Sequence, residues 1–302
     1  MKILYIAVHY DKNENKWRSE TWINNSFKKI NIETIRLDYR QIIKQKNISF
    51  LKKTIKENSK FCDLIFLQRG EKLTTDLFAE IKIPIIFWST EPINLKNDVD
   101  KLLGSNIFSW VFVHTYSCLD RVNREFQHLN NNCSVLHNAL PDEKIKFNSS
   151  FKKHFAIFNR NLSLRRRLWL YPNLKYIKII KGKYGTDYFN DLSESYISVN
   201  VHYSSKNLDD FETGIFEAIA SGSVVISEKL DHRVLKDLKL EDSIIQVKNP
   251  MDLNKKLFFY KKNISELNYF KEKSKNSISY NTWTSRMKTV KEKFEEILNS
   301  IS

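Results

Sequence analysis

The stretch Asp209-Asp-Phe-Glu-Thr-Gly-Ile-Phe-Glu-Ala-Ile-Ala-Ser-Gly-Ser-Val-Val-Ile-Ser227 predicts a short acidic helix followed at once by a buried strand. Asp209 can cap this helix, and Glu212, three residues later, completes a capping box. Gly222 supplies the left-handed residue at which such helices commonly stop. Glu217 is a carboxylate among small apolar residues, so it needs a polar partner, and a ribose diol would serve as one. The plainer alternative is a solvated Glu on an amphipathic helix.

This segment resembles the donor-site helix of GT-B glycosyltransferases, especially glycosyltransferase family four and the CgeB-like (spore-maturation) glycosyltransferases. There a Glu, seven residues and Glu-Ala-(Met/Leu)-Ala-Cys-Gly precede a Val-rich strand. The resemblance implies that Glu217 hydrogen-bonds the ribose hydroxyls of a nucleotide, with Thr213 and Gly214 in the same donor site. Asp209 stands at the first Glu of the pattern, and Glu212 replaces a Gly of family four. The Arg that CgeB-like members usually carry before Phe-Glu is missing.

A basic cluster, Asn159–Arg167, follows a predicted strand and opens a helix. Backbone N–H groups and the helix dipole attract anions at such a position, and guanidinium groups can hold a diphosphate with paired hydrogen bonds. Family four carries an Arg at this strand end and a Lys about five residues later, both on the donor diphosphate. The resemblance gives these roles to Arg160 and Arg165, with Arg166 as a substitute. A solvated basic helix face is the alternative. Tyr184, after the next strand, is a candidate to stack on the base.

Strands alternate with helices along the chain, which predicts an α/β protein with parallel sheets. The predicted strands are Lys2–Val8, Glu33–Leu37, Asp63–Gln68, Pro84–Trp88, Trp110–Val113, Ser134–Leu136, Phe155–Phe158, Tyr176–Ile180, Ile197–His202, Val224–Ser227 and Ile244–Val247. Besides the acidic helix, the predicted helices are Thr21–Ile30, Phe50–Asn58, Leu73–Ile81, Thr115–Glu125, Leu164–Leu170 and Thr282–Asn299.

This order predicts two successive doubly wound, Rossmann-like domains, as the GT-B resemblance also implies. The polar, Lys-rich segment Pro141–Ser150 is the expected linker. We therefore expect an acceptor-side domain over 1–145 and a nucleotide-sugar-binding domain over 146–281, facing each other across a cleft. In the GT-B fold a last helix, here 282–302, crosses back onto the first domain.

The catalytic base of such an enzyme would come from the first domain. His9 and Glu91 each follow a predicted strand, where the carboxyl ends of parallel strands border a ligand crevice. An inverting enzyme would need one of them to take the proton of the acceptor hydroxyl, and Glu91 ranks slightly above His9. A retaining enzyme would need no such base. Asp98-Val-Asp100 matches the letters of a metal-binding DXD pattern but lies in a polar linker, so no metal or other cofactor is expected.

The composition fits two soluble domains. The chain has 302 residues, of which 41% are hydrophobic and 13% aromatic, so a core is available and global disorder is excluded. It shows no run of eighteen apolar residues and no signal peptide. Its three cysteines, odd in number and unevenly spaced, predict a reducing cytoplasm.

The net charge of +15 is the strongest compositional bias. Lys is scattered among Asn and Ile, a composition typical of proteins encoded by AT-rich genomes, and the sequence contains no recognised nucleic-acid-binding module. We therefore expect no specific nucleic-acid partner. The positive charge is still compatible with peripheral contact with an anionic membrane.

These observations predict a cytoplasmic, metal-independent glycosyltransferase. The positive charge also allows peripheral association with the inner membrane face. It would transfer a sugar from a nucleotide-sugar donor to a glycan or lipid-linked acceptor, in bacterial or viral polysaccharide biosynthesis. One alternative is a non-catalytic nucleotide- or sugar-phosphate-binding protein of the same fold. Another, based on charge alone, is an RNA- or membrane-binding basic protein.

Overall fold

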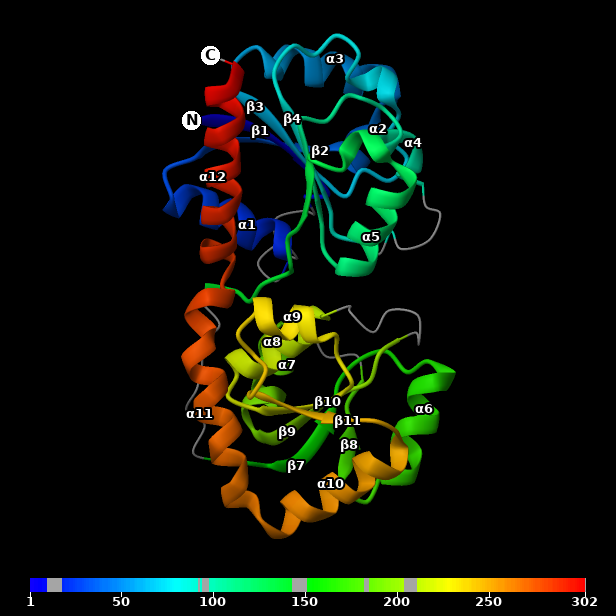
Figure 1. Cartoon of the computed structure of the whole chain (residues 1–302), viewed down its shortest axis with the longest axis vertical. Helices are drawn as coiled ribbons and strands as arrows, with labels where there is room; N and C mark the ends of the chain where they lie inside the picture. Colours follow the sequence, from blue (N-terminus) through cyan, green and yellow to red (C-terminus); the bar gives the residue numbers. More distant parts are fainter. Residues whose placement is uncertain are drawn as a thin grey trace. The chain divides into compact units, whose positions relative to one another are not determined.

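The computed structural model describes residues 1–9, 18–91, 93, 98–142, 151–181, 185–203 and 211–301. The chain divides into two compact units (Figure 1). Unit 1 consists of Met1–His137 and Trp283–Ser302, and unit 2 consists of Asn138–Thr282. The sequence predicts the first boundary after residue 145, a position within residues 143–150, which lie outside the described segments.

Unit 1 is built on a six-stranded parallel sheet in the order β2-β1-β3-β4-β5-β6. Its strands are β1 (Lys2–Ala7), β2 (Glu33–Asp38), β3 (Leu64–Gln68), β4 (Ile85–Ser89), β5 (Trp110–Val113) and β6 (Cys133–Val135). Strands β3 and β4 are buried at every position, because helices cover both faces of the sheet. The order reverses between β1 and β3, which is where ligands bind in open α/β sheets.

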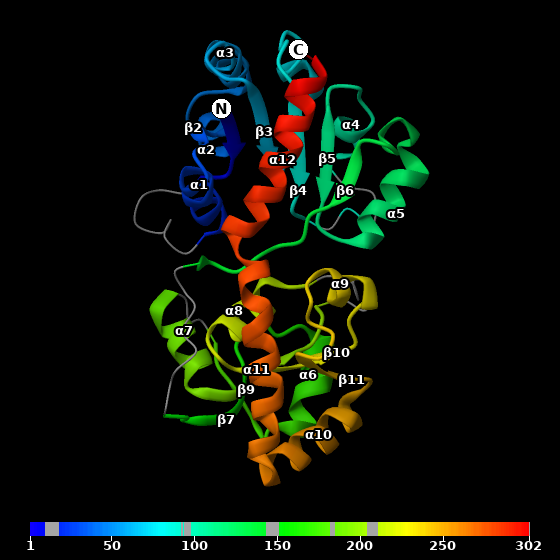
Figure 2. The same cartoon turned by 60° about the vertical axis from the view of Figure 1, so that its left-hand side comes forward.

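Helices cover the two faces of this sheet unequally. The helices are α1 (Ser19–Lys29), α2 (Tyr39–Gln45), α3 (Ile48–Ser59), α4 (Asp100–Leu103), α5 (Tyr116–Glu125) and α12 (Trp283–Ile301), with 3₁₀ turns η2 (Thr75–Leu77) and η3 (Gln127–Leu129). Apolar side chains of α3, α4 and α5 share one core with alternate residues of the strands. The opposite face is covered by α1 and α12, which lie side by side (Figure 2).

Helix α12 brings the end of the sequence back onto unit 1, as predicted. Its buried residues recur with helical spacing at Trp283, Met287, Val290, Phe294 and Ile297. The Phe294 ring lies 5.5 Å from Phe66 of β3 and 6.2 Å from Phe27 of α1, and Trp283 packs 5.9 Å from Trp88 of β4. These aromatic contacts fix α12 as an integral layer of unit 1.

Unit 2 is built on a five-stranded parallel sheet in the order β11-β10-β9-β7-β8. Its strands are β7 (His154–Phe158), β8 (Ile177–Ile179), β9 (Ser195–Asn200), β10 (Val224–Glu228) and β11 (Ile244–Val247). Here the strand order reverses between β7 and β9. The connections that follow these two strands therefore leave toward opposite faces of the sheet, at the position where ligands bind in open α/β sheets.

The helices of unit 2 also form two layers. They are α6 (Leu164–Leu170), α7 (Gly185–Ser193), α8 (Thr213–Ala220), α9 (His232–Asp237), α10 (Pro250–Lys262) and α11 (Leu267–Ser277), with 3₁₀ turns η5 (Tyr171–Asn173), η6 (Ile264–Glu266) and η7 (Ile278–Asn281). Helices α6 and α10 bury Trp169, Leu170, Leu253 and Leu257 in one core on the sheet. Helix α8 contacts both α7 and α11, and Leu267 at the start of α11 joins the same core.

The structure corrects several predicted elements. The predicted helix Leu73–Ile81 is only the single turn η2, preceded by Lys72 at φ +67°. The acidic helix begins at Thr213 with Glu212 as its N-cap, and the Glu212 side chain makes no capping bond. The predicted cap Asp209 lies outside the described residues. Helix α7 was missed, because its sequence is polar and opens on a glycine. Among the described helices, none has the length and apolar character needed to cross a bilayer.

The predicted stop of α8 at Gly222 is confirmed. Gly222 has φ +76°, its N–H donates to the Ile219 carbonyl at 2.9 Å, and the Ser223 N–H donates to the Ala218 carbonyl at 3.0 Å. These two bonds form a Schellman motif, in which a left-handed residue satisfies the last carbonyls of a helix.

Gly222→Ala should therefore lower the free energy of unfolding by about 1–2 kcal/mol, since a Cβ disfavours the left-handed conformation. Urea denaturation measures the change. Gly222→Asn should recover part of the loss, because Asn visits this region more readily. Equal stability of the Gly and Ala proteins would contradict the assignment.

Candidate functional site

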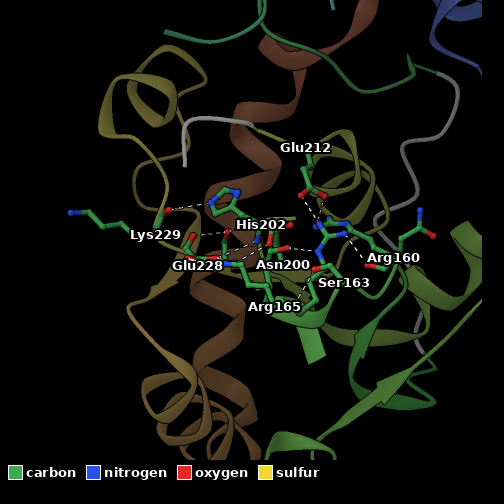
Figure 3. A network of polar contacts seen from close by, with 12 residues as sticks. Arg160, Ser163, Arg165, Asn200, His202, Glu212, Glu228 and Lys229 are labelled. Carbon is green, nitrogen blue, oxygen red and sulfur yellow. Dashed lines mark hydrogen bonds and ion pairs between the residues drawn. The ribbon is translucent and has the colours of Figure 1, made fainter. Parts of the chain in front are cut away.

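The polar residues of unit 2 gather where β7 and β9 end. These strands are hydrogen-bonded neighbours, with Ile157 paired to Ser198. The segment after β7 carries the basic cluster and leads into α6, and β9 is followed by His202. The first turn of α8 completes the site. Its polar contacts form one connected network (Figure 3).

Arg160 is the central residue of this site. Its side chain is only 9% exposed, and no described residue accepts a hydrogen bond from Nε, Nη1 or Nη2. The nearest carboxylate oxygen, Oε2 of Glu212, lies 3.5 Å from Nη1. A buried guanidinium that lacks hydrogen bonds carries a large desolvation cost. The arrangement therefore favours binding of an anion with several acceptor oxygens.

Gly214 makes room for this guanidinium. A Cβ at Gly214 would lie 2.5 Å from Nε and 2.6 Å from Nη2 of Arg160, well inside contact distance. The Arg160 side chain thus lies against the backbone of the first turn of α8. A helix N-terminus has a partial positive charge, so it adds to the attraction for an anion.

Arg166 holds the surrounding segments together. Its Nη2 donates to Glu212 Oε1 at 2.6 Å, its Nε to the Val201 carbonyl at 2.8 Å, and its Nη1 to the Asn161 carbonyl at 3.0 Å. Burial lowers the pKa of the Arg166 guanidinium, the Glu212 charge opposes this, and the neighbouring Arg160 adds to the lowering. Arg166 therefore fixes the β7 loop, the end of β9 and the start of α8 in one arrangement.

Arg165 is paired differently. Its guanidinium forms a two-bond pair with the Glu228 carboxylate at the end of β10, with Nη1 2.8 Å from Oε2, and Nη1 also donates to the His202 carbonyl at 2.9 Å. The His202 N–H donates to the same carboxylate at 3.2 Å, as Figure 3 shows. Arg165 thus ties α6 to the ends of β9 and β10.

Glu217 lies one helical turn beyond Gly214 and accepts a hydrogen bond from the Tyr188 hydroxyl at 2.7 Å. Burial raises the pKa of the Glu217 carboxyl, against the opposing effects of Tyr188 and the Arg160 charge. Burial also raises the pKa of Tyr188 well above its ordinary value, so this hydroxyl keeps its proton and donates. Tyr188 belongs to the missed helix α7, and no local sequence signal connects it to a residue of α8.

The structure describes only one of the two remaining donor-site candidates, Thr213 and Tyr184. Thr213 is exposed at the start of α8. Tyr184 lies outside the described residues.

The two candidate bases of unit 1 lie in contrasting surroundings. His9 is buried, its Nε2 lies 3.3 Å from the Tyr5 carbonyl, and its ring packs edge-on against Tyr5. Burial, together with the charge of Arg36, lowers the pKa of His9 to about 4, so the ring is neutral near pH 7. The Glu91 side chain is 45% exposed and forms an ion pair of 2.5 Å with Arg69 Nη2.

Several contacts fix the position of Arg69, the partner of Glu91. It has φ +78°, an uncommon conformation for a residue with a side chain, and its N–H donates to the Trp88 carbonyl at 3.0 Å. Its Nε donates to Glu71 at 3.1 Å, and Glu71 also accepts from the Tyr39 hydroxyl at 2.7 Å. Glu91 is thus the exposed end of a row of polar contacts that runs from Tyr39 through Glu71 and Arg69. Arg69, Glu71 and Glu91 lie in the segments that follow β3 and β4.

The Asp98-Val-Asp100 segment has a structural role at its second carboxylate. Arg121 donates to both oxygens of Asp100, at 3.0 and 2.7 Å. Within the described parts of the chain, no three His, Cys, Asp or Glu side chains group as metal ligands.

No known protein-family model matches the chain, and a search of curated proteins finds no match. Solved structures match over nearly its whole length. A glycosyltransferase from Rickettsia africae is 13% identical with a TM-score of 0.64 over 98% of both chains. Alr3699/HepE from Anabaena, solved in complex with UDP and glucose, is 10% identical with a TM-score of 0.67 over 98% of this chain and 99% of that one.

A third similar structure is the DNA-modifying enzyme β-glucosyltransferase, 13% identical with a TM-score of 0.62, over 99% of this chain and all of that one. The chain has the GT-B fold. At these identities the similarity establishes the architecture of the two units. The chemistry has to be inferred from the residues of the site.

Proposed function

We propose that this GT-B chain is a glycosyltransferase that moves a sugar from a nucleotide-sugar donor to an acceptor hydroxyl. The observation that carries the proposal is the buried guanidinium of Arg160 at the strand-order reversal of unit 2, to which the described residues offer no hydrogen-bond acceptor. A buried cation with several unused donors suits a diphosphate better than a neutral ligand. The UDP and glucose bound to Alr3699/HepE, which shares the fold, support the same ligand class.

In this proposal the donor lies along the first turns of α8. Arg160 and the N-terminus of α8 bind the diphosphate, and Glu217, one turn further on, accepts hydrogen bonds from the ribose hydroxyls. Tyr188 keeps Glu217 oriented through its 2.7 Å hydrogen bond. Thr213 is exposed at the start of the helix, where a hydroxyl can reach the phosphates.

The proposed reaction needs charge stabilisation at the leaving group. The acceptor oxygen forms a bond to the anomeric carbon, the bond from that carbon to the phosphate oxygen breaks, and the nucleoside diphosphate leaves with the bonding electron pair. Arg160 is positioned to neutralise this new negative charge, which is electrostatic catalysis by a fixed cation. We therefore propose a metal-independent transfer.

Arg165 and Arg166 are proposed to position the site. The carboxylates of Glu228 and Glu212 already engage their guanidinium groups. Their effect on the donor is to hold the β7 loop and α8 so that Arg160 stays in place.

On the acceptor side we propose Glu91 as the base, because its carboxylate is exposed and held by Arg69. His9 is buried with a pKa of about 4, which makes it a poor proton acceptor near neutral pH. We propose a glycan or lipid-linked acceptor and a cytoplasmic enzyme of polysaccharide biosynthesis. The free thiols of all three cysteines support the reducing compartment.

The second candidate is a non-catalytic nucleotide- or sugar-phosphate-binding protein. Glu212 favours it, because a carboxylate 3.5 Å from Arg160 competes with the phosphates for that cation. Donor hydrolysis by the wild-type chain separates the two candidates. If only Glu212→Gly hydrolysed a nucleotide sugar, the native chain would be the binding protein.

Glu217→Gln should weaken nucleotide binding about tenfold, or about 1–2 kcal/mol, because a charge-assisted hydrogen bond to the ribose becomes a neutral one. A thermal-shift panel of nucleotides and nucleotide sugars identifies the ligand first, and calorimetry then measures the affinity. Glu266→Gln, an exposed carboxylate in the same unit, is the matched control. Unchanged affinity of Glu217→Gln for every ligand of the wild type would remove Glu217 from the donor site.

A further inference from the structure

The outer surface of the α6 and α10 layer is unusual in composition. We call it the α6–α10 face and define it by six exposed side chains: Leu164, Leu168, Tyr171, Leu174, Met251 and Phe258. Leu164, Leu168 and Met251 are 76%, 65% and 73% exposed. Large apolar side chains scattered singly over a surface need no explanation, but a contiguous group marks an interaction site.

The helical spacing places these side chains outward. Leu164, Leu168 and Tyr171 recur at intervals of four and three on the side of α6 opposite Leu170, which is fully buried. On α10, Met251 and Phe258 recur at an interval of seven, opposite the buried Leu253 and Leu257.

The two outward stripes belong to one surface. The Asn254 amide of α10 donates to Asn173 Oδ1 of η5 at 2.8 Å, and the Asn173 amide lies 3.4 Å from the Pro250 carbonyl. Both helices bury their inner sides in the same core on the same sheet face. Their outer sides therefore both point away from that face of the sheet.

The charge of this surface is almost purely positive. Residues 151–181 contain nine Lys and Arg and no Asp or Glu; Arg160, Arg165 and Arg166 belong to the candidate site, which leaves six. Residues 248–262 contain five Lys and a single Asp. Exposed cations flank the apolar side chains, among them Arg167, Lys175, Lys255 and Lys262. Lys262 Nζ lies 4.3 Å above the Phe258 ring. Long basic side chains beside apolar ones are typical of segments that lie in a membrane interface.

We propose that the α6–α10 face docks on an anionic phospholipid bilayer, with Lys and Arg on the headgroups and the Leu and Met side chains in the acyl boundary. Charge complementarity selects this occupant. A second copy of the chain would bring one basic face against another. Nucleic acid would match the charge, but it stacks its bases on aromatic rings, whereas four of the six side chains are aliphatic. The inference is independent of the sugar transfer and would hold for either candidate function.

Vesicle flotation without nucleotide sugar tests this proposal. The wild-type chain should bind vesicles of phosphatidylcholine with phosphatidylglycerol and float poorly with phosphatidylcholine alone. Lys255→Gln with Lys262→Gln should weaken binding roughly thirtyfold, at about fivefold for each cation near an anionic surface. The control pair is Lys53→Gln with Lys60→Gln in unit 1, which removes the same charge elsewhere.

The apolar side chains have their own test. Leu168→Gln with Met251→Gln should weaken binding by at least about tenfold, since each side chain loses burial in the acyl boundary. The matched control is Phe61→Gln, 69% exposed on unit 1, which should bind like the wild type.

Several outcomes would overturn the proposal. These are no flotation with anionic vesicles, equal flotation with neutral ones, or equal losses in the test and control variants. The face would be assigned to nucleic acid if a single-stranded oligonucleotide bound through Lys255 and Lys262 while vesicle binding was unchanged by the substitutions at Lys255, Lys262, Leu168 and Met251. Donor binding, measured without vesicles, reports separately on the proposed function.

Discussion

Arg160→Met should slow sugar transfer by about 10²–10³-fold, the effect of removing one preorganised group that stabilises a developing charge. The same substitution should raise the free energy of unfolding of the ligand-free protein by about 1–3 kcal/mol, because it removes a buried guanidinium that makes no hydrogen bond to the described part of the chain and keeps an apolar side chain of similar length. A stability gain combined with an activity loss is the signature of a residue kept for its ligand.

Transfer kinetics and urea denaturation measure the two effects. Arg167→Met, an exposed cation of the following helix α6, is the matched control and should leave both nearly unchanged. Gly214→Ala should reproduce the activity loss, because its Cβ would displace the Arg160 guanidinium. Normal transfer by Arg160→Met would refute the diphosphate assignment. Loss of wild-type activity in EDTA that magnesium restores would refute the metal-independent route.

Glu91→Gln should reduce transfer by at least about a hundredfold at unchanged donor affinity, because a carboxamide cannot take the acceptor proton. Single-turnover kinetics and calorimetry with the donor separate the two quantities. Arg69→Gln should lower transfer less, since it releases Glu91 without removing the carboxylate.

The control for this prediction is Glu80→Gln, an exposed carboxylate of unit 1 that pairs with Lys56. Transfer by Glu91→Gln within a few-fold of the wild type would contradict a role as base. The proton would then go to the leaving phosphate, as in a retaining reaction.

Sequence reasoning succeeds where the signal is local. Apolar runs between turn residues gave both parallel sheets, and Leu164–Leu170 was predicted as a helix with the bounds that α6 has. Gly222 was recognised because the end of a helix demands a left-handed residue. The wrong helix at Leu73–Ile81 shows the limit, since apolar residues at near-helical spacing do not form a helix where Lys72 turns the chain at φ +67°.

The environment of the candidate site depends on contacts distant in sequence. Arg165 looked like a phosphate ligand, yet its guanidinium pairs with Glu228, 63 residues away. Tyr188 reaches Glu217 across 29 residues, from a helix that the sequence did not reveal. Arg160 packs against Gly214, 54 residues away, and finds no hydrogen-bond acceptor among the described residues, which no spacing rule encodes. The donor-site roles of these residues remain predictions that the variants above test.

The return of α12 to unit 1 determines the order in which the protein can fold during synthesis. Residues 138–282 of unit 2 are contiguous, so the ribosome can release that unit complete. Unit 1 starts first but lacks the layer of Trp283, Phe294 and their neighbours until all of unit 2 has been made. At ~5–20 residues per second, the aromatic surface of Phe27 and Phe66 stays uncovered for on the order of ten seconds or more. Until α12 has been made, the nascent chain therefore exposes an aggregation-prone apolar face of unit 1.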